Sequence, residues 1–347
     1  MNILFVHWLN GIGGGEKYIK NLIDNLPNGF NISFIGKEQK NLIVEDCKKD
    51  IKYYYTHFKR NFFIFPTFSL KLFLLLIKVI KKDNIEVIHL NDIYLLPTFL
   101  MIRKLYPDIK IVFTSHGRWD THFVFNRILL KLMDFEFVIA PTPIQYFRLK
   151  YILKKVILLP FFVSNISDNY KKLSGNKIKL GLIGRFSPVK NHILAFDIVN
   201  KLGNRYELHV FGDKTLEINE ESDEYRKKIL SYKDKKNIIF HGFVNDEEKI
   251  YKSIDILLVT SISESFGMTT IEAFSYAIPV VSTLTEGSSF LIRNGYNGYI
   301  CEDVEEFCSK IEYIGMNYET FSKNALESAY SFSKENYINK YIKNLKG

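Results

Sequence analysis

The chain has 347 residues, of which 47% are hydrophobic and 24% are charged. A single hydrophobic core rarely grows beyond roughly 250–300 residues, so this length predicts two domains. The hydrophobic content suffices for packed cores and excludes an intrinsically disordered chain.

The formal net charge of +9 suits nucleic acid, an anionic membrane surface or an acidic substrate. The basic residues are dispersed and form no RNA-reading motif, so we expect no nucleic-acid partner. Aromatic and basic side chains interleave in residues 52–63. This segment is either a strand followed by a solvated loop or a peripheral contact with an anionic bilayer or a glycolipid acceptor.

The chain has only three cysteines, Cys47, Cys301 and Cys308, which is typical of a reducing compartment and not of a disulfide framework. Residues 2–7 are apolar but lack a basic leader and a cleavage site, so they predict a first strand instead of a signal peptide. The most apolar region, residues 62–80, is interrupted by one proline and two lysines, which disfavours a membrane-spanning helix. We therefore expect a cytoplasmic protein.

Apolar runs alternate with helical patterns along the first half, which predicts βαβ units on a parallel sheet. Strands are expected at residues 2–7, 31–35, 87–89 and 110–114, with further apolar segments at 137–140 and 156–160. Helices are expected after the first strand, with an apolar face between residues 18 and 26, and at residues 70–82 and 94–105. A polar segment, residues 164–176, is expected to link the two domains.

The alternation restarts after this segment. Strands are expected at residues 178–183, 206–211, 237–240, 255–259 and 279–281. Helices are expected at residues 192–202, 305–314, 322–332 and 335–345. The simplest architecture is a pair of Rossmann-like halves with a cleft between them.

The glycine-rich loop after the first strand contains Gly13, Gly14 and Gly15. It does not match a dinucleotide-binding fingerprint, because Glu16 stands where the third glycine belongs and no acidic residue ends the second strand. The loop is either a place where the backbone approaches a ligand closely or a plain tight turn.

Two carboxylates, Glu264 and Glu272, flank a helix expected to begin near Gly267. Glu264 follows a buried strand, at the sheet edge where ligands bind in open α/β sheets. The start of a helix favours an anionic ligand, phosphate above all. In the alternative interpretation, Thr269 and Glu272 form a capping box and Glu264 is an ordinary loop residue.

Three more polar residues follow strands. Arg185 and Lys190 come after the strand at 178–183, and His116 comes after the strand at 110–114. Two cations near a helix start suit a diphosphate, whose charge must be neutralised as it leaves. Taken singly, surface cations and a lone histidine are more often structural.

Taken together, these motifs resemble glycosyltransferase family 4 over almost the whole chain. The motifs are Gly13-Gly14-Gly15-Glu16, Ser115-His116-Gly117, Gly184-Arg185 with Lys190, Gly242, Glu264 and Glu272 with Phe266-Gly267, and Pro279-Val280-Val281. The resemblance implies an α/β protein of GT-B fold, with two Rossmann-like domains facing each other across a cleft. Residues 1–165 would form the acceptor-side domain, residues 177–330 the donor domain, and residues 331–347 a helix that crosses back to the first domain.

The resemblance also implies roles for individual residues. Arg185 and Lys190 would bind the donor diphosphate, Glu264 the sugar hydroxyls and Glu272 the ribose, while His116 would contact the sugar near its reacting face. His116, Arg185, Lys190 and Glu264 are thus the implied catalytic residues. The further donor-binding residues would be Gly13, Gly14, Gly15, Gly184, Gly242, Phe243, Val244, Phe266, Gly267, Met268 and Thr269.

The implied activity is retaining transfer of a sugar from a UDP-, GDP- or ADP-sugar to a saccharide or glycolipid acceptor. The setting would be the synthesis of bacterial lipopolysaccharide, capsule or another surface polysaccharide, at the inner face of the cytoplasmic membrane. No Asp-x-Asp motif occurs, so we expect no metal and no cofactor. Two segments depart from the family pattern, residues 161–164 and 285–289, and leave the acceptor and the donor sugar open. The alternatives are a GT-B protein that binds or isomerises a nucleotide-sugar without transfer, and a nucleic-acid or membrane-binding module.

Overall fold

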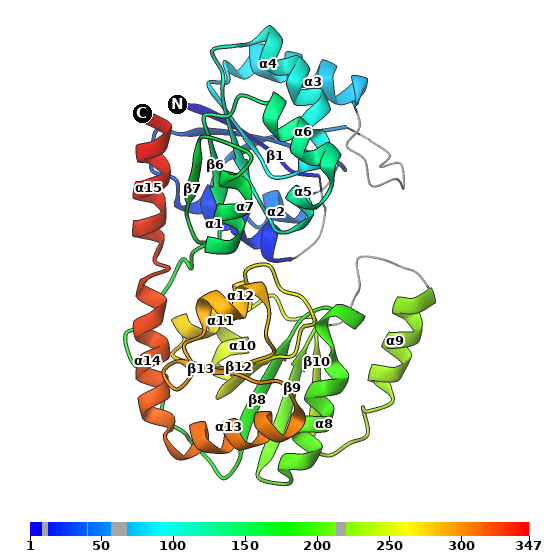
Figure 1. Cartoon of the computed structure of the whole chain (residues 1–347), viewed down its shortest axis with the longest axis vertical. Helices are drawn as coiled ribbons and strands as arrows, with labels where there is room; N and C mark the ends of the chain where they lie inside the picture. Colours follow the sequence, from blue (N-terminus) through cyan, green and yellow to red (C-terminus); the bar gives the residue numbers. More distant parts are fainter. Residues whose placement is uncertain (9–12, 40, 57–67, 213–219, 347) are drawn as a thin grey trace. The chain divides into compact units, whose positions relative to one another are not determined.

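The computed structural model describes the chain except for residues 9–12, 40, 57–67, 213–219 and 347 (Figure 1). The chain divides into two compact units. The first unit comprises Met1–Ser164 together with Lys334–Gly347, and the second comprises Asn165–Ser333. Each unit contains one parallel sheet covered by helices, which confirms the expected pair of Rossmann-like domains.

The sheet of the first unit has seven strands in the order β3-β2-β1-β4-β5-β6-β7. The strands are β1 (Asn2–Val6), β2 (Asn31–Gly36), β3 (Ile51–Tyr55), β4 (Val87–Leu90), β5 (Lys110–Thr114), β6 (Phe137–Ala140) and β7 (Val156–Leu158). The central strands are continuous apolar runs with almost no exposed surface, because helices cover both faces of the sheet.

The helices of the first unit lie in two layers (Figure 1). The helical segments are α1 (Gly14–Asn25), α2 (Leu42–Glu45), α3 (Leu70–Asp83), η1 (Ile93–Leu95), α4 (Leu96–Leu105), α5 (Trp119–His122), α6 (Val124–Leu132), α7 (Pro143–Lys150) and α15 (Lys334–Lys346). Side chains of α3, α4, α6 and α7 form one apolar core with the sheet. On the other face, α15 packs beside α1, where the Tyr337 and Tyr18 hydroxyls lie 2.6 Å apart.

The sheet of the second unit has six strands in the order β10-β9-β8-β11-β12-β13. The strands are β8 (Ile178–Ile183), β9 (Tyr206–Phe211), β10 (Ile238–Gly242), β11 (Ile256–Val259), β12 (Val280–Ser282) and β13 (Gly298–Ile300). The helical segments are η2 (Pro188–Lys190), α8 (His192–Leu202), α9 (Glu220–Leu230), α10 (Glu247–Lys252), α11 (Met268–Ser275), α12 (Glu286–Leu291), α13 (Val304–Met316) and α14 (Tyr318–Tyr330).

Most of the expected elements occur within a residue or two of their predicted bounds. The helix expected at 94–105 begins as the 3₁₀ turn η1, and Pro97 lies in the first turn of α4, where its missing N–H is tolerated. Six-residue helices such as α10 and α12 were not predicted, because they are too short to show a helical period. Of the aromatic and basic segment 52–63, residues 52–55 belong to β3 and residues 57–63 lie outside the described part of the chain.

The strand orders fix where each unit gathers functional side chains. In both sheets the order reverses beside the first strand, between β1 and β4 in one unit and between β8 and β11 in the other. The loops at the carboxyl ends of these strands diverge and leave a crevice that ligands occupy in open parallel sheets. Among the described residues, no helix is both long and apolar enough to cross a bilayer.

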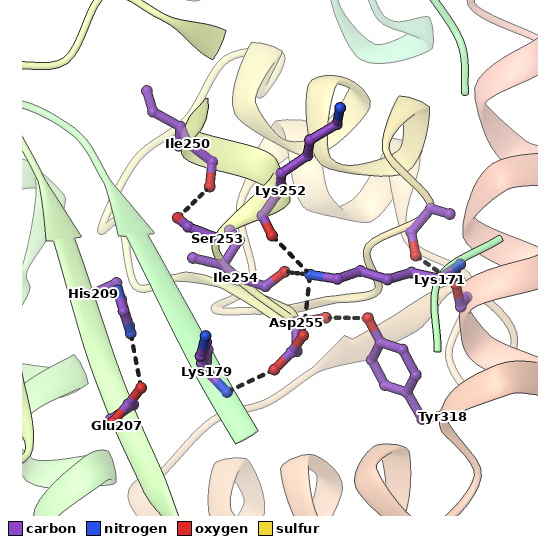
Figure 2. Close-up of polar contacts among 12 residues, drawn as sticks. Lys171, Lys179, Glu207, His209, Ile250, Lys252, Ser253, Ile254, Asp255 and Tyr318 are labelled. Carbon is purple, nitrogen blue, oxygen red and sulfur yellow. Dashed lines mark hydrogen bonds and ion pairs between the residues drawn. The ribbon is translucent and has the colours of Figure 1, made fainter. Parts of the chain in front are cut away.

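At the opposite edge of the second sheet, Lys171 anchors the segment that enters this unit (Figure 2). Its ammonium group lies 3.0 Å from the Asp255 carboxylate and also donates to the carbonyl of Ile254. Asp255 is buried at the start of β11 and accepts a second hydrogen bond from the Lys179 backbone N–H at 2.9 Å. Burial lowers the pKa of Lys171, and the charge of Asp255 opposes this effect.

We predict that Lys171→Ala lowers the free energy of unfolding of the second unit by about 2–3 kcal/mol, because it leaves the buried Asp255 carboxylate without its counter-charge. Chemical denaturation followed by circular dichroism measures this change. Lys172→Ala is the matched control, since Lys172 is 66% exposed and its ion pair with Glu319 is solvated. Equal losses in the two variants would contradict the anchoring role.

Candidate active site

Three glycines end adjacent strands at the carboxyl edge of the second sheet. Gly184 follows β8, Gly212 follows β9 and Gly242 ends β10. Gly212 has φ +138°, and a Cβ atom at this position would lie 1.9 Å from the Gly184 carbonyl oxygen. Only glycine fits there, so the three strand ends stay close and their backbone remains accessible to a ligand.

The structure brings Lys190 and Glu264 together. The Lys190 ammonium donates to the Glu264 carboxylate at 2.6 Å, and both side chains are roughly three-quarters buried. Lys190 ends the turn η2 after β8, and Glu264 lies in the loop after β11. These are the two strands between which the strand order reverses, so the pair lies at the expected ligand-binding edge.

Backbone contacts fix both members of this pair. The Thr260 hydroxyl donates to the Lys190 carbonyl at 3.0 Å, and the Gly287 N–H donates to the Glu264 carbonyl at 2.9 Å. A Cβ atom on Gly287 would lie 2.2 Å from the Phe266 carbonyl oxygen, so this glycine permits α12 to press against the Glu264 loop. The side chain of Lys190 lies across Gly184, where a Cβ atom would approach it to 3.3 Å.

Arg185 directly follows Gly184 and its side chain is exposed. No ion pair or side-chain hydrogen bond of Arg185 is found within the part of the chain that the structure describes. Its guanidinium group is therefore accessible to solvent at the same sheet edge as Lys190.

The start of α11 lies beside this pair. Gly267 caps the helix with φ +95° and has no side chain to bond the first turn. A Cβ atom on Gly267 would lie 3.7 Å from the Glu264 side chain. The first backbone N–H groups of α11 and their positive dipole end are thus adjacent to Glu264.

The capping-box interpretation of Thr269 and Glu272 is wrong, because the helix begins at Met268 and its cap is Gly267. Glu272 is buried within α11, where its carboxylate accepts a 2.7 Å hydrogen bond from the Tyr251 hydroxyl. Burial and the charge of Glu272 raise the pKa of Tyr251, which keeps its hydroxyl protonated as a donor.

The other donor-binding candidates divide by side-chain burial. Phe266 and Met268 are buried, so only their backbone can face a ligand. After β10, Phe243 is exposed and Val244 is half-buried.

In the first unit, the structure brings the glycine loop and His116 together. A Cβ atom on Gly15 would lie 3.3 Å from Nδ1 of His116. Gly14 begins α1 and Gly13 precedes it, and the Gly13 N–H donates to the Glu16 carboxylate at 3.1 Å. Nε2 of His116 lies 3.4 Å from the amide oxygen of Asn91, which follows β4.

Sequence reasoning assigned no role to three charged residues behind this loop: His7, Glu16 and Asp92. The His7 ring nitrogens lie 3.3 Å from the carboxylate of Glu16 on one side and 3.3 Å from that of Asp92 on the other. Asp92 also accepts the Trp8 backbone N–H at 2.6 Å. His7 directly follows β1 and Asp92 follows β4 by two residues. His116 was identified because polar residues just after parallel strands gather at one sheet edge, and this strand-end rule would also have identified His7 and Asp92.

The electrostatics of this cluster keep His7 and His116 in different protonation states. Burial alone would lower the pKa of His7, but the charges and hydrogen bonds of Asp92 and Glu16 raise it to about 9. Burial, followed by the positive charge of His7, lowers the pKa of His116 to about 4. At neutral pH His7 is therefore a cation and His116 a neutral imidazole.

Two family models match the chain. The model described as "Glycosyl transferases group 1" matches residues 165–328, and the model described as "Glycosyltransferase Family 4" matches residues 12–148. Together they cover most of the chain and one lies in each structural unit.

Among curated proteins, the O-antigen biosynthesis glycosyltransferase WbnH of Escherichia coli is 23% identical and the alignment covers 98% of both chains. An uncharacterised protein from the cps region of Klebsiella pneumoniae is 24% identical over 78% of this chain and 81% of its own. Among solved structures, Anabaena HepE in complex with UDP and glucose superposes with a TM-score of 0.80 at 18% identity over 99% of both chains. A sucrose-phosphate synthase from Thermosynechococcus elongatus superposes with a TM-score of 0.77 at 17% identity, over 99% of this chain and 98% of its own.

The family matches, these relatives and the parallel sheets of both units agree with one another. The chain therefore belongs to the family-4 type of glycosyltransferases and is a glycosyltransferase of GT-B fold.

Proposed function

We propose that the protein is a retaining glycosyltransferase that uses a nucleotide-diphosphate sugar as donor and a saccharide or glycolipid as acceptor. The Lys190–Glu264 ion pair carries this proposal, since it lies at the ligand-binding edge of the second sheet. An ammonium group has three N–H donors, so Lys190 can hold Glu264 with one and a phosphate oxygen with another.

The residues around the pair suit a leaving diphosphate. Breaking a sugar–phosphate bond places negative charge on the diphosphate and positive character on the anomeric carbon. Lys190, Arg185 and the start of α11 would stabilise the negative charge, and Glu264 would hold sugar hydroxyls. In the proposed same-face reaction, a leaving-group phosphate oxygen accepts the proton of the acceptor hydroxyl, so no carboxylate nucleophile is required.

Glu272 is proposed to bind the ribose. Its carboxylate accepts a hydrogen bond from the Tyr251 hydroxyl. This bond orients the carboxylate and so supports a role in binding the ribose hydroxyls. Backbone groups of Gly242, Phe243 and Val244, at the end of β10, are proposed to contact the base. UDP-sugars are the first donors to test, because HepE was crystallised with UDP, with UDP-glucose, and with UDP and glucose.

In the first unit, neutral His116 is proposed to hydrogen-bond a sugar hydroxyl beside Gly13, Gly14 and Gly15. His7, held between Glu16 and Asp92, is proposed as a positioning residue that fixes the glycine loop. We expect activity without a metal or cofactor, so treatment with EDTA should leave turnover unchanged.

The proposed biological setting is the synthesis of a bacterial surface polysaccharide. The curated relatives include an O-antigen transferase, a capsular polysaccharide transferase of Staphylococcus aureus and a lipopolysaccharide core transferase of Rhizobium meliloti. A cytoplasmic enzyme at the inner membrane face would meet both nucleotide-sugars and lipid-linked acceptors.

The proposal is tested by incubating the purified protein with UDP-, GDP- and ADP-sugars and measuring nucleotide release by NMR, with and without a lipid-linked saccharide. We expect one donor to be consumed, faster when the acceptor is present, with the anomeric configuration kept in the product. Donor binding without acceptor-dependent release would favour the alternative of a protein that binds or isomerises a nucleotide-sugar. No binding of any nucleotide would contradict both.

We predict that Lys190→Ala and Glu264→Ala each reduce turnover by at least roughly 10², because each removes preorganised charge from the donor site. Since the two side chains bond each other, the double variant should lose much less than the product of the single effects. Steady-state kinetics of the wild type, the two single variants and the double variant with the identified donor measure this double-mutant cycle. Lys201→Ala and Glu305→Ala provide a control, because they remove an ion pair between the exposed ends of α8 and α13. Near-wild-type rates for Lys190→Ala or Glu264→Ala would contradict the assigned roles.

We predict that His7→Gln makes the protein less stable at neutral pH and slows turnover, because it leaves two buried carboxylates facing each other. The folded-state pKa of His7, about 9, exceeds its ordinary value of 6.5. Its contribution, on the order of 3 kcal/mol, is complete below about pH 6.5 and is lost as the pH rises through about 9. Urea denaturation between pH 6 and 10 should show this decline in the wild type and not in the variant. A decline of equal size in both would contradict a charged His7.

A further inference from the structure

Three polar side chains form a chain of contacts on one face of the second sheet, where β9 pairs with β10. Side chains alternate along β9: Val210 belongs to the hydrophobic core, so Glu207 and His209 point to the opposite face. Nε2 of His209 lies 3.2 Å from the Glu207 carboxylate (Figure 2), and Nδ1 lies 2.9 Å from Nε2 of His241 on β10. We call Glu207, His209 and His241 the histidine relay, and its two histidines the histidine pair.

The hydrogen bonds of the relay assign its protons. Burial would raise the pKa of Glu207, but the hydrogen bonds from His209 and Lys177 lower it, so Glu207 is a carboxylate that can only accept. Nε2 of His209 therefore carries a proton. When both rings are neutral, Nδ1 of His209 is then an acceptor, so His241 donates to it through Nε2. Nδ1 of His241 is left as an acceptor at the outer end of the relay.

One further proton reverses this outer end. Only one hydrogen fits between two nitrogens 2.9 Å apart, and Nε2 of His209 is already protonated, so the added proton must reside on Nδ1 of His241. The result is the same whichever ring carries the formal charge. A second added proton would place two N–H groups against each other, so the histidine pair takes up a single charge. Nδ1 of His241 is thus an acceptor in the neutral pair and a donor in the charged pair.

Charged groups from three elements act on the histidine pair. Glu207 belongs to β9, Lys177 directly precedes β8, and Lys249 belongs to α10. Burial, followed by the positive charges of His209 and Lys249, lowers the pKa of His241. We therefore expect the neutral pair above pH 7 and the charged pair only at lower pH.

His241 is the extra residue of a β-bulge next to the carboxyl end of β10. The register between β9 and β10 shifts after Phe240, and regular pairing resumes at Gly242. Bulges re-aim side chains and are frequent beside functional sites. The His241 ring stacks on Phe211, with ring centroids 4.4 Å apart and planes inclined by 7°. This stacking and the bond to His209 fix an imidazole that is otherwise exposed.

The relay ends beside the segment that is proposed to contact the donor base. Gly242 directly follows His241, and a Cβ atom on Gly242 would meet no atom within 4 Å, so the space next to it is open. The helix α10 carries Lys249, whose charge acts on His241. The same helix carries Tyr251, which bonds Glu272, the proposed ribose ligand. One short helix therefore supports both ends of the proposed nucleoside site.

We propose that His241 binds the donor base: its Nδ1 accepts an N–H of the base while the histidine pair is neutral, and proton uptake by the pair reverses this polarity and weakens donor binding. Uracil, guanine and adenine each carry an N–H that can fill this role. His241 can act in this way only if the base lies beside Gly242, so the assignment rests on the proposed function. It adds to the proposed backbone contacts a side chain that couples donor affinity to pH.

The first measurement is ¹⁵N NMR of the histidine side chains in the free protein, which needs no ligand. At pH 8 we expect both rings of the pair to carry their proton on Nε2, and we expect uptake of a single proton as the pH falls to 5. Glu207→Gln should let His241 adopt the Nδ1–H form at pH 8, because an amide group can donate to Nε2 of His209. An Nδ1–H form of His241 in the wild type at pH 8, or two independent titrations, would overturn the proposal.

The second measurement is calorimetric titration with UDP, GDP and ADP, continued with whichever of them the wild type binds most tightly. His241→Phe retains a ring that can stack on Phe211, and at pH 8 it should bind that nucleotide about fivefold more weakly, the effect of one hydrogen bond. Glu207→Gln should weaken binding about threefold through the changed proton position on His241. Lowering the pH from 8 to 5 should weaken binding at least about twofold more in the wild type than in His241→Phe.

Glu248→Gln is the matched control, because it removes an exposed carboxylate of α10 that pairs with Lys252. This variant should bind the nucleotide within about 1.5-fold of the wild type and keep its pH dependence. Circular dichroism should be the same for all variants. Wild-type affinity in His241→Phe, or an unchanged pH dependence in that variant, would overturn the proposal while leaving the proposed function intact. Absence of binding of all three nucleotides to the wild type would overturn both.

Discussion

The parallel pairing of β8 with β11 is the constraint on which the proposed donor site depends. The strand order reverses between these neighbours, so the loops after them flank one crevice although they lie far apart in sequence. Lys190 comes from one loop and Glu264 from the other, and they meet at 2.6 Å. Close packing at Gly184, Gly212 and Gly287 lets the surrounding backbone come near enough to hold that geometry.

The first unit repeats the same design with different chemistry. Its strand order reverses between β1 and β4, and the residues that follow these strands, His7 and Asp92, form a buried charged pair extended by Glu16. Burial, followed by the positive charge of His7, lowers the pKa of His116, so His7 is a cation while His116 stays neutral. The same arrangement fixes the glycine loop, because Glu16 binds both His7 and the Gly13 N–H.

Much of the fold followed from sequence, because continuous apolar runs and helical periodicity mark the strands and long helices of a parallel α/β protein. The Lys190–Glu264 neighbourhood followed from the strand-end rule. The capping box failed because Gly267, with its positive φ, starts the helix before Thr269 can cap it. The His7–Asp92 contact depends on strand pairing across 85 positions, and the His209–His241 contact depends on the pairing of β9 with a bulged β10. Neither is visible in local periodicity.

The most direct test of the central claim is a crystal structure of the protein with the nucleoside diphosphate of its donor. We predict that the diphosphate oxygens lie within hydrogen-bond distance of Lys190 and Arg185, near the start of α11, with the ribose hydroxyls on Glu272. A diphosphate bound elsewhere on the second unit, with the Lys190–Glu264 pair unchanged and away from the ligand, would contradict it.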